Sequence, residues 1–170
     1  MNISIVKVDE DYQSGYQYTL SEQPGKNFDL SFKPDLTPSQ MLHMGVFGGN
    51  YFTNAPSEFP KEWFEGVKFT ENATADKNLN FFGVNASQPL AEWQRKGWIN
   101  PEDPKGWFLW YCRYYMGRRI NDEDSRQIKR WKNMRRHISQ LQKSCYPGDL
   151  TCRPRQRQAL LHWAYDSSQI

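Results

Sequence analysis

The sequence lacks several features by which membrane, secreted and disulfide-rich proteins are recognised. No run approaches the ~18 consecutive apolar residues that a membrane-spanning helix needs, and the first residues lack the apolar core of a signal peptide. Cysteine is scarce, with three in 170 residues, and an odd number fits a reducing compartment better than a disulfide framework. These absences predict an intracellular protein, cytoplasmic or nuclear, that has no membrane partner.

The few cysteines do not form a familiar metal motif. Cys145 and Cys152 flank a Pro-Gly turn, so they could approach each other, and His137 and His162 lie nearby in the sequence. A zinc site is conceivable there, but the spacing matches none of the tight CxxC knuckles. We therefore predict no metal and leave open whether the two cysteines pair. Cys112 lies in an aromatic segment and is expected to be a small buried hydrophobe.

Catalytic motifs are also missing. The chain contains no GxSxG, no HExxH and no P-loop, and its three histidines are far apart in the sequence. Active sites do assemble from distant residues, so these absences leave open whether the protein is an enzyme. No cofactor and no catalytic residue is predicted.

Arginine is absent from the first half of the chain. Residues 1–85 hold six lysines and eleven acidic residues, which gives 6 − 11 = −5, whereas residues 86–170 hold sixteen Lys/Arg and eight acidic residues, which gives 16 − 8 = +8. Such asymmetry indicates either that the basic half binds an anionic partner or that the acidic half neutralises it within the molecule.

Aromatic residues, by contrast, are abundant at 15% of the chain, and they concentrate between residues 103 and 119. At helical spacing, one face of this segment carries Trp107, Trp110, Tyr111, Tyr114 and Arg118. A second apolar line of Phe108, Cys112 and Tyr115 lies beside it. A helix that is apolar on most sides is normally buried on most sides, so we expect it to be the central helix.

Further helices are predicted along the chain. Thr37 is predicted to be the N-cap of one helix, because Pro38 and Gln40 follow it at the first and third helical positions. A second, short helix is predicted at residues 60–65. A third starts near residue 87, with Leu90, Trp93 and Trp98 facing inward. The longest should run over residues 122–143. Its apolar stripe is predicted to comprise Ile128, Trp131, Met134, Ile138 and Leu141, and its basic face Lys129, Lys132, Arg136 and Lys143. The last helix should start at residues 151–154.

The fold class that follows is mainly α: a single helical domain of about six helices around the central aromatic helix. A short N-terminal β-hairpin is possible, because residues 2–8 and 16–20 alternate weakly between apolar and polar. We assign residues 1–24 to a variable N-terminal extension and residues 25–170 to the helical domain.

The leading functional hypothesis is an intracellular protein that binds an anionic partner, with nucleic acid as the leading candidate, because basic side chains neutralise phosphates. The candidate contacts are Arg118, Arg119, Arg126, Lys129, Arg130, Lys132, Arg135, Arg136, Arg153, Arg155 and Arg157. The arginines after residue 152 have the wrong sign for the start of a helix, which a bound anion or an acidic partner from the first half would relieve.

Two alternatives remain. One is an enzyme or ligand-binding protein whose pocket of Arg113, Tyr114 and Trp110 takes a small phosphorylated or carboxylated molecule, because arginine binds such anions bidentately. The other is a protein–protein interaction module. The sequence predicts no oligomeric state.

The chain contains several distinctive sequence motifs: GVFGG at residues 45–49, GVNASQPL at 83–90, DPKGWFLWYCRYYMGRR at 103–119 and CRPRQRQALL at 152–161. With these stretches, most of residues 25–170 resembles an uncharacterised family of small proteins. The resemblance implies no activity, fold or site residue for this chain.

Overall fold

The computed structural model describes residues 4–70, 76–84, 86 and 99–170, and the helix predicted from residue 87 with Leu90, Trp93 and Trp98 lies outside them. The chain divides into two compact units. Unit 1 comprises Met1–Lys33, Pro56–Pro60 and Gln88–Lys129, and unit 2 comprises Pro34–Ala55, Lys61–Ser87 and Arg130–Ile170. The predicted boundary after residue 24 stays a prediction.

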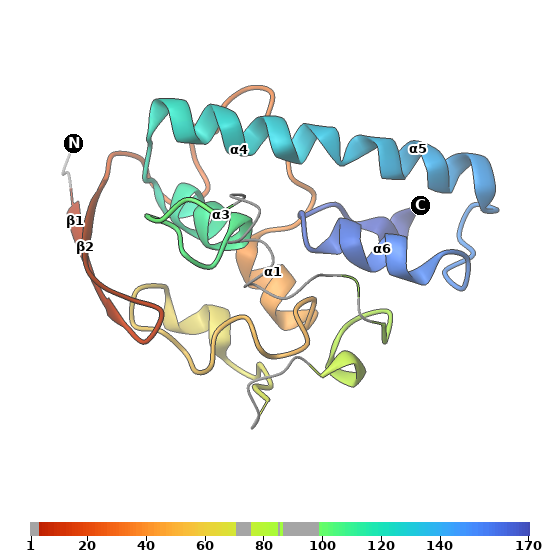
Figure 1. Cartoon of the computed structure of the whole chain (residues 1–170), viewed down its shortest axis with the longest axis horizontal. Coiled ribbons are helices and arrows are strands. Elements are labelled where there is room, and N and C mark those ends of the chain that lie inside the picture. Colours follow the sequence, from red (N-terminus) through yellow and green to blue (C-terminus); the bar gives the residue numbers. More distant parts are fainter. Residues whose placement is uncertain (1–3, 71–75, 85, 87–98) are drawn as a thin grey trace. The chain divides into compact units, whose positions relative to one another are not determined.

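Unit 1 begins with the expected β-hairpin, which is confirmed (Figure 1). Strands β1 (Ser4–Glu10) and β2 (Gln13–Leu20) pair antiparallel, and the register shifts by one residue between Val8 and Asp9. The extra residue on β2 is Gly15, whose φ of +83° suits the left-handed region that glycine tolerates. Val8 and Tyr18 are buried, so one face of the hairpin packs against the unit.

The aromatic helix α3 (Trp107–Met116) supplies the core of unit 1, as its pattern predicted. Its residues from Trp107 to Tyr114 are all buried. The ring of Phe32 lies among four of its aromatic rings, with centroid distances of 5.5–6.3 Å. The indole nitrogens of Trp107 and Trp110 donate to Gln127 O and Asp124 Oδ1 of the following helix, which fixes the two helices to each other.

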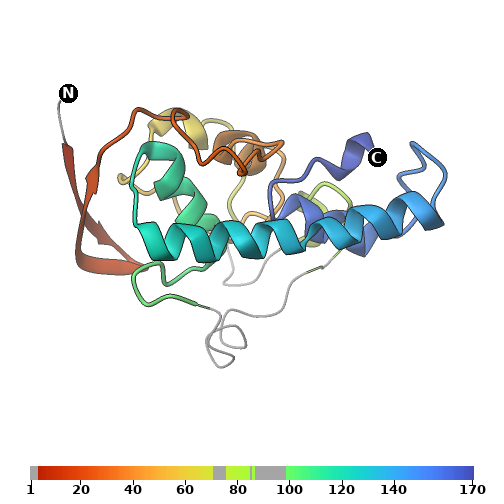
Figure 2. The same cartoon turned by 90° about the horizontal axis from the view of Figure 1, so that it is seen from above.

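The longest predicted helix is divided in the structure. Residues 122–143 form two successive helices, α4 (Asn121–Asn133) and α5 (Arg135–Ser144), with a turn at Met134 between them (Figure 2). The amide of Met134 bonds to Trp131 O, three residues back, and that tighter bond interrupts the α-helical pattern. In the predicted apolar stripe, Ile128, Trp131 and Leu141 are buried, whereas Met134 and Ile138 are only half-buried.

Unit 2 contains the other helices of the described residues. In α1 (Pro38–His43) the predicted cap is confirmed as a capping box between Thr37 and Gln40. The short 3₁₀ helix η1 (Lys61–Phe64) lies where residues 60–65 predicted a helix, and η2 (Lys77–Leu79) follows it. Helix α6 (Pro154–Leu161) starts at the predicted position, and the 3₁₀ turn η3 (Ser167–Gln169) follows.

The core of unit 2 is organised around a pair of stacked rings. Trp131 and Tyr165 lie almost parallel, with centroids 4.9 Å apart, and the Tyr165 hydroxyl donates to Trp131 O at 2.6 Å. Leu141, Leu160 and Leu161 are completely buried.

The predicted class of about six helices in a mainly α domain is therefore wrong. Among the described residues, helices of eight residues or more are α3, α4, α5 and α6, and a two-stranded antiparallel sheet accompanies them. Long stretches such as residues 21–37 and 44–60 are turns and loops, because glycine, proline and asparagine there favour turn conformations over helix. No helix in the described ranges is long and apolar enough to cross a membrane.

Candidate nucleic-acid interface

The predicted pocket residues of unit 1 lie in its interior. Arg113, Tyr114 and Trp110 are 0%, 2% and 0% exposed. The Arg113 guanidinium donates from Nε to Glu58 Oε2 at 2.7 Å and from Nη1 to Asp103 Oδ1 at 2.8 Å. Burial by itself lowers the pKa of Arg113, but the hydrogen bonds and charges of the two carboxylates raise it further than burial lowers it.

Arg118, a predicted nucleic-acid contact, belongs to the same buried group. Its Nη1 and Nη2 atoms donate to Oδ1 and Oδ2 of Asp103 at 2.8 and 2.7 Å, and its residue is 1% exposed. Glu58, Asp103, Arg113 and Arg118 therefore form a buried charge network of two carboxylates and two guanidiniums. Glu58, from the acidic first half of the chain, neutralises Arg113 of the basic second half. This pair is an instance of the neutralisation within the molecule that the charge asymmetry of the sequence suggested as one explanation.

The other predicted contacts of unit 1 are more exposed. Arg119 is half-buried over the Tyr114 ring, 3.8 Å from its centroid, and donates to Tyr114 O and Lys26 O. Arg126 is exposed, but Glu123 binds it on the same helix at 2.5 and 3.0 Å. Lys129 is exposed.

In unit 2, most of the predicted basic residues lie on α5 or at the start of the adjacent helix α6. α6 lies alongside α5 in both views, and the loop between them reverses the chain (Figures 1 and 2). We call residues 135–157 the basic helical hairpin. It holds six Lys/Arg and one acidic residue, which gives 6 − 1 = +5. Its exposed cationic residues are Arg135, Arg136, Lys143, Arg153 and Arg155.

Two cross-links hold the basic helical hairpin together. Cys145 and Cys152 form a disulfide, which resolves the pairing that the sequence left open. The side-chain amide of Gln156 on α6 contacts His137 Nδ1 at 2.8 Å and Gln140 Oε1 at 2.5 Å on α5. Disulfides persist mainly in oxidising compartments, whereas the odd cysteine count favoured a reducing one, so the cellular location stays a prediction.

The remaining predicted contacts of unit 2 differ in exposure. Arg157 is completely buried and donates to backbone oxygens of Cys152, Ser167 and Ile170 at 2.8–2.9 Å. These carbonyls offset its charge near the start of α6. Arg130 is half-buried with its guanidinium over the Trp163 ring, 5.2 Å from the centroid, and Lys132 is half-buried.

Tyr146 is the residue of this surface that sequence reasoning missed. It lies in the loop of the basic helical hairpin and is 85% exposed. A signal was present, because an aromatic residue beside Pro147 and Gly148 lies in a turn, outside any helical apolar stripe.

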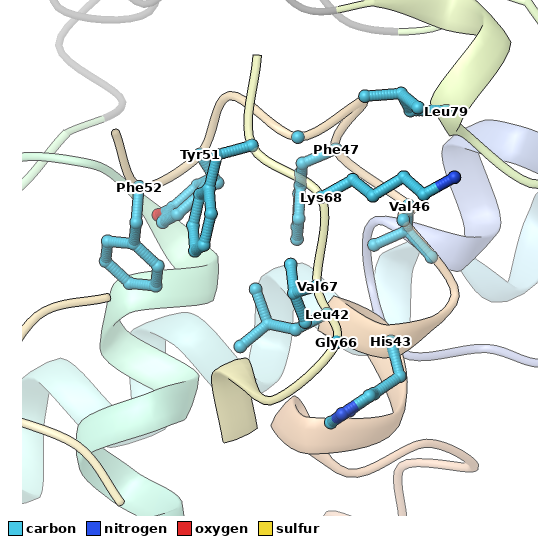
Figure 3. Close-up of a pocket in the computed structure, with 13 residues that line it drawn as sticks. Leu42, His43, Val46, Phe47, Tyr51, Phe52, Gly66, Val67, Lys68 and Leu79 are labelled. Atoms are coloured by element: carbon cyan, nitrogen blue, oxygen red, sulfur yellow. The ribbon is translucent and has the colours of Figure 1, made fainter. Parts of the chain in front are cut away.

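A small pocket lies elsewhere in unit 2 and has a volume of about 170 Å³ (Figure 3). In Figure 3, the lining residues Phe47 and Tyr51 lie side by side, whereas the ammonium end of Lys68 lies away from Tyr51 and Phe52. Among the described residues that line it, Lys68 is the only Lys or Arg.

The volume of this pocket limits what it could hold. A cavity of ~150 Å³ holds one benzene ring, and pockets for drug-sized ligands start at about 300 Å³. The pocket is thus too small for a nucleotide, and it contains none of the predicted residues Arg113, Tyr114 and Trp110. The small-molecule alternative stays a prediction.

His162 packs beside this pocket and has a strongly perturbed pKa. Its Nε2 atom lies 2.7 Å from Val46 O, and its ring lies 4.9 Å from that of Phe47. Burial lowers the pKa of His162 to about 4, and the hydrogen bond to Val46 O offsets this effect only in part. A neutral ring that donates to a carbonyl oxygen fits a structural role.

The free energy of unfolding is expected to decrease as the pH falls from about 6.5 to about 4. An unfolded histidine has a pKa of about 6.5, so between about pH 6.5 and 4 the unfolded chain binds a proton that folded His162 does not. The neutral His162 ring therefore makes its full contribution to the free energy of unfolding above about pH 6.5. By about pH 4 the free energy of unfolding is lower by on the order of 2–3 kcal/mol. Urea unfolding of wild type and His162→Gln across this range measures it, with exposed His43→Gln as control. Equal pH slopes in all three proteins would contradict it.

No protein-family model, curated protein or solved structure matches this chain. Within the described part of the chain, no three His, Cys, Asp or Glu side chains are grouped so as to hold a metal ion.

Proposed function

We propose that this protein binds a polyanion, with nucleic acid as the leading candidate, through the basic helical hairpin. The observation that carries the proposal is the concentration of exposed cations on this segment: five exposed Lys/Arg accompany a single acidic residue, Asp149. A surface of this sign raises the local concentration of a polyanion and releases counterions from it on binding.

The hydrogen bonds around Asp149 support this assignment. Its carboxylate accepts from the Thr151 amide at 3.1 Å and the Thr151 hydroxyl at 2.6 Å, so it is held within its own loop. Arg136 and Lys143 form no ion pair with a carboxylate among the described residues, in contrast to Arg113, Arg118 and Arg126. Arg136 and Lys143 are therefore the most available cations of α5.

The basic helical hairpin is also ordered before binding. The disulfide and the Gln156 contacts join α5 to α6 at two places. A surface whose backbone is already fixed loses less conformational entropy on association, which favours affinity. A basic face on a mobile tail would lose more conformational entropy on binding, which would lower its affinity.

Neutralising three of these cations is expected to weaken binding and to reduce its salt dependence. In Arg136→Gln/Lys143→Gln/Arg153→Gln, the slope of log K against log [salt] should fall by about 2–2.7, because each lost phosphate contact removes roughly 0.7–0.9. Affinity at low salt should drop on the order of 10- to 100-fold. Fluorescence anisotropy with labelled single-stranded and duplex oligonucleotides measures both quantities.

The control for this experiment has the same net charge. Lys7, Lys33 and Lys61 are exposed and lie outside the basic helical hairpin, so Lys7→Gln/Lys33→Gln/Lys61→Gln removes three charges elsewhere. We expect the control to keep most of the wild-type slope. If both triple variants lose the same amount, binding depends on net charge and not on this surface. If wild type binds no oligonucleotide at low salt, the proposal fails.

A further inference from the structure

Tyr146 is displayed at the end of the basic helical hairpin with most of its ring in water. It is 85% exposed, whereas the next most exposed aromatic among the described residues, Phe81, is 45% exposed. A single exposed apolar residue is ordinary on protein surfaces, so exposure alone does not mark a site. What distinguishes Tyr146 is the loop that carries it and the charge around it.

The loop of Tyr146 is fixed by covalent and hydrogen bonds. The disulfide closes it from Cys145 to Cys152, and inside it the Asp149 amide donates to Tyr146 O at 3.1 Å and the Cys152 amide to Asp149 O at 3.2 Å. Gly148 takes the left-handed conformation that the turn needs, with φ of +82°. The ring is therefore presented on a closed turn, and little backbone entropy remains to be lost when a partner binds.

Cations flank this ring on both sides in the sequence. Lys143 precedes it by three residues on α5, and Arg153 follows the second cysteine of the disulfide; both are exposed. A cationic surface with a projecting aromatic ring is the arrangement by which proteins hold single-stranded nucleic acid: cations follow the phosphates while rings stack on the bases. In a duplex the bases are already stacked on one another, so a surface ring gains nothing comparable there.

We propose that Tyr146 stacks on an unpaired base and thereby gives the basic helical hairpin a preference for single-stranded over duplex nucleic acid. This inference rests on the proposed function, because it names the form of polyanion that the same surface takes. The cations supply affinity that is independent of the bases, and the ring supplies a contribution that requires an accessible base.

Three labelled probes separate these contributions: an oligothymidine strand, the same strand paired with oligoadenosine, and an abasic deoxyribose-phosphate strand of equal length. Tyr146→Ala should weaken binding of the oligothymidine strand about 5- to 150-fold, the cost of one lost base stack. Its affinities for the duplex and the abasic strand should equal those of wild type, and its salt slope should be unchanged. Tyr146→Trp should retain the single-strand preference, because indole also stacks.

Leu30→Ala is the matched control, because Leu30 is 90% exposed and lies in unit 1. It should leave all three affinities unchanged. If Tyr146→Ala binds all three probes as wild type does, the inference is overturned while polyanion binding stands. An equal loss on all three probes also overturns it. If wild type binds no probe, the proposed function fails together with the inference.

Discussion

Replacing Asp103 with asparagine is expected to lower the free energy of unfolding by about 3–5 kcal/mol, the cost of removing one partner from a buried ion pair. Asp103 is 1% exposed, and its two oxygens accept three hydrogen bonds from Arg113 and Arg118 at 2.7–2.8 Å. Asparagine keeps the shape but removes the charge and places an NH₂ group against one guanidinium. Two buried guanidiniums would then share the single charge of Glu58.

Urea unfolding followed by tryptophan fluorescence measures this effect. Asp122→Asn is the control, because Asp122 is exposed in the first turn of α4 and its loss should cost about 0.3–1 kcal/mol. The double variant Asp103→Asn/Arg118→Met restores the balance of one carboxylate and one guanidinium. We expect it to be less destabilised than the sum of the two single variants, as the coupling of contacting residues requires. Additive losses would show that the charges do not depend on one another.

This network also shows where sequence reasoning succeeds and where it fails. The apolar periodicity of residues 107–116 predicted a buried helix, because helical spacing alone places those side chains on shared faces. Arg113 lies inside that segment, and the same spacing cannot state what neutralises it. Its partner Glu58 is 55 residues away in the sequence, and such a contact follows from tertiary packing. An arginine within an apolar helix signals burial with a partner, but not which partner.

The basic face was predicted in the same partial way. Helical spacing placed Arg136 and Lys143 on the polar side of the segment 122–143, and both are exposed. The predicted nucleic-acid contacts, which include Arg136, also contained Arg118 and Arg157, and these two are buried and bonded to Asp103 and to backbone oxygens. Charge counts cannot separate these cases, because a guanidinium satisfies buried acceptors as readily as it binds phosphate. Whether the exposed members bind nucleic acid stays a prediction.

Local turn chemistry explains the elements that were assigned correctly. Thr37, Pro38 and Gln40 specify a helix start through contacts within four residues, and the structure forms that capping box. The break at Met134 has no such signal, since methionine favours helix. An apolar stripe that continues across the break therefore predicted one helix where there are two.

Replacing Gly117 with alanine is expected to destabilise the protein by about 3 kcal/mol or more, since it combines backbone strain with a steric clash. Gly117 ends α3 with φ of +121°, a conformation that residues with a Cβ rarely adopt. An added Cβ would lie 2.1 Å from Glu22 O, a backbone atom that cannot rotate away. The Ser21 amide also donates to Gly117 O at 2.9 Å, so the clash acts where the end of β2 is bonded to the end of α3.

Gly15→Ala separates the two causes. Gly15 also has a positive φ of +83°, but an added Cβ there would meet no atom within 4 Å. It should cost about 1 kcal/mol, the usual penalty for a left-handed alanine. Urea unfolding of both variants gives the difference, which measures the clash at Gly117. Equal losses in the two variants would mean that the Glu22 segment moves aside at little cost, and that the hairpin is not held tightly against α3. A much larger loss for Gly117→Ala would show that this glycine is required because two backbone segments approach each other there.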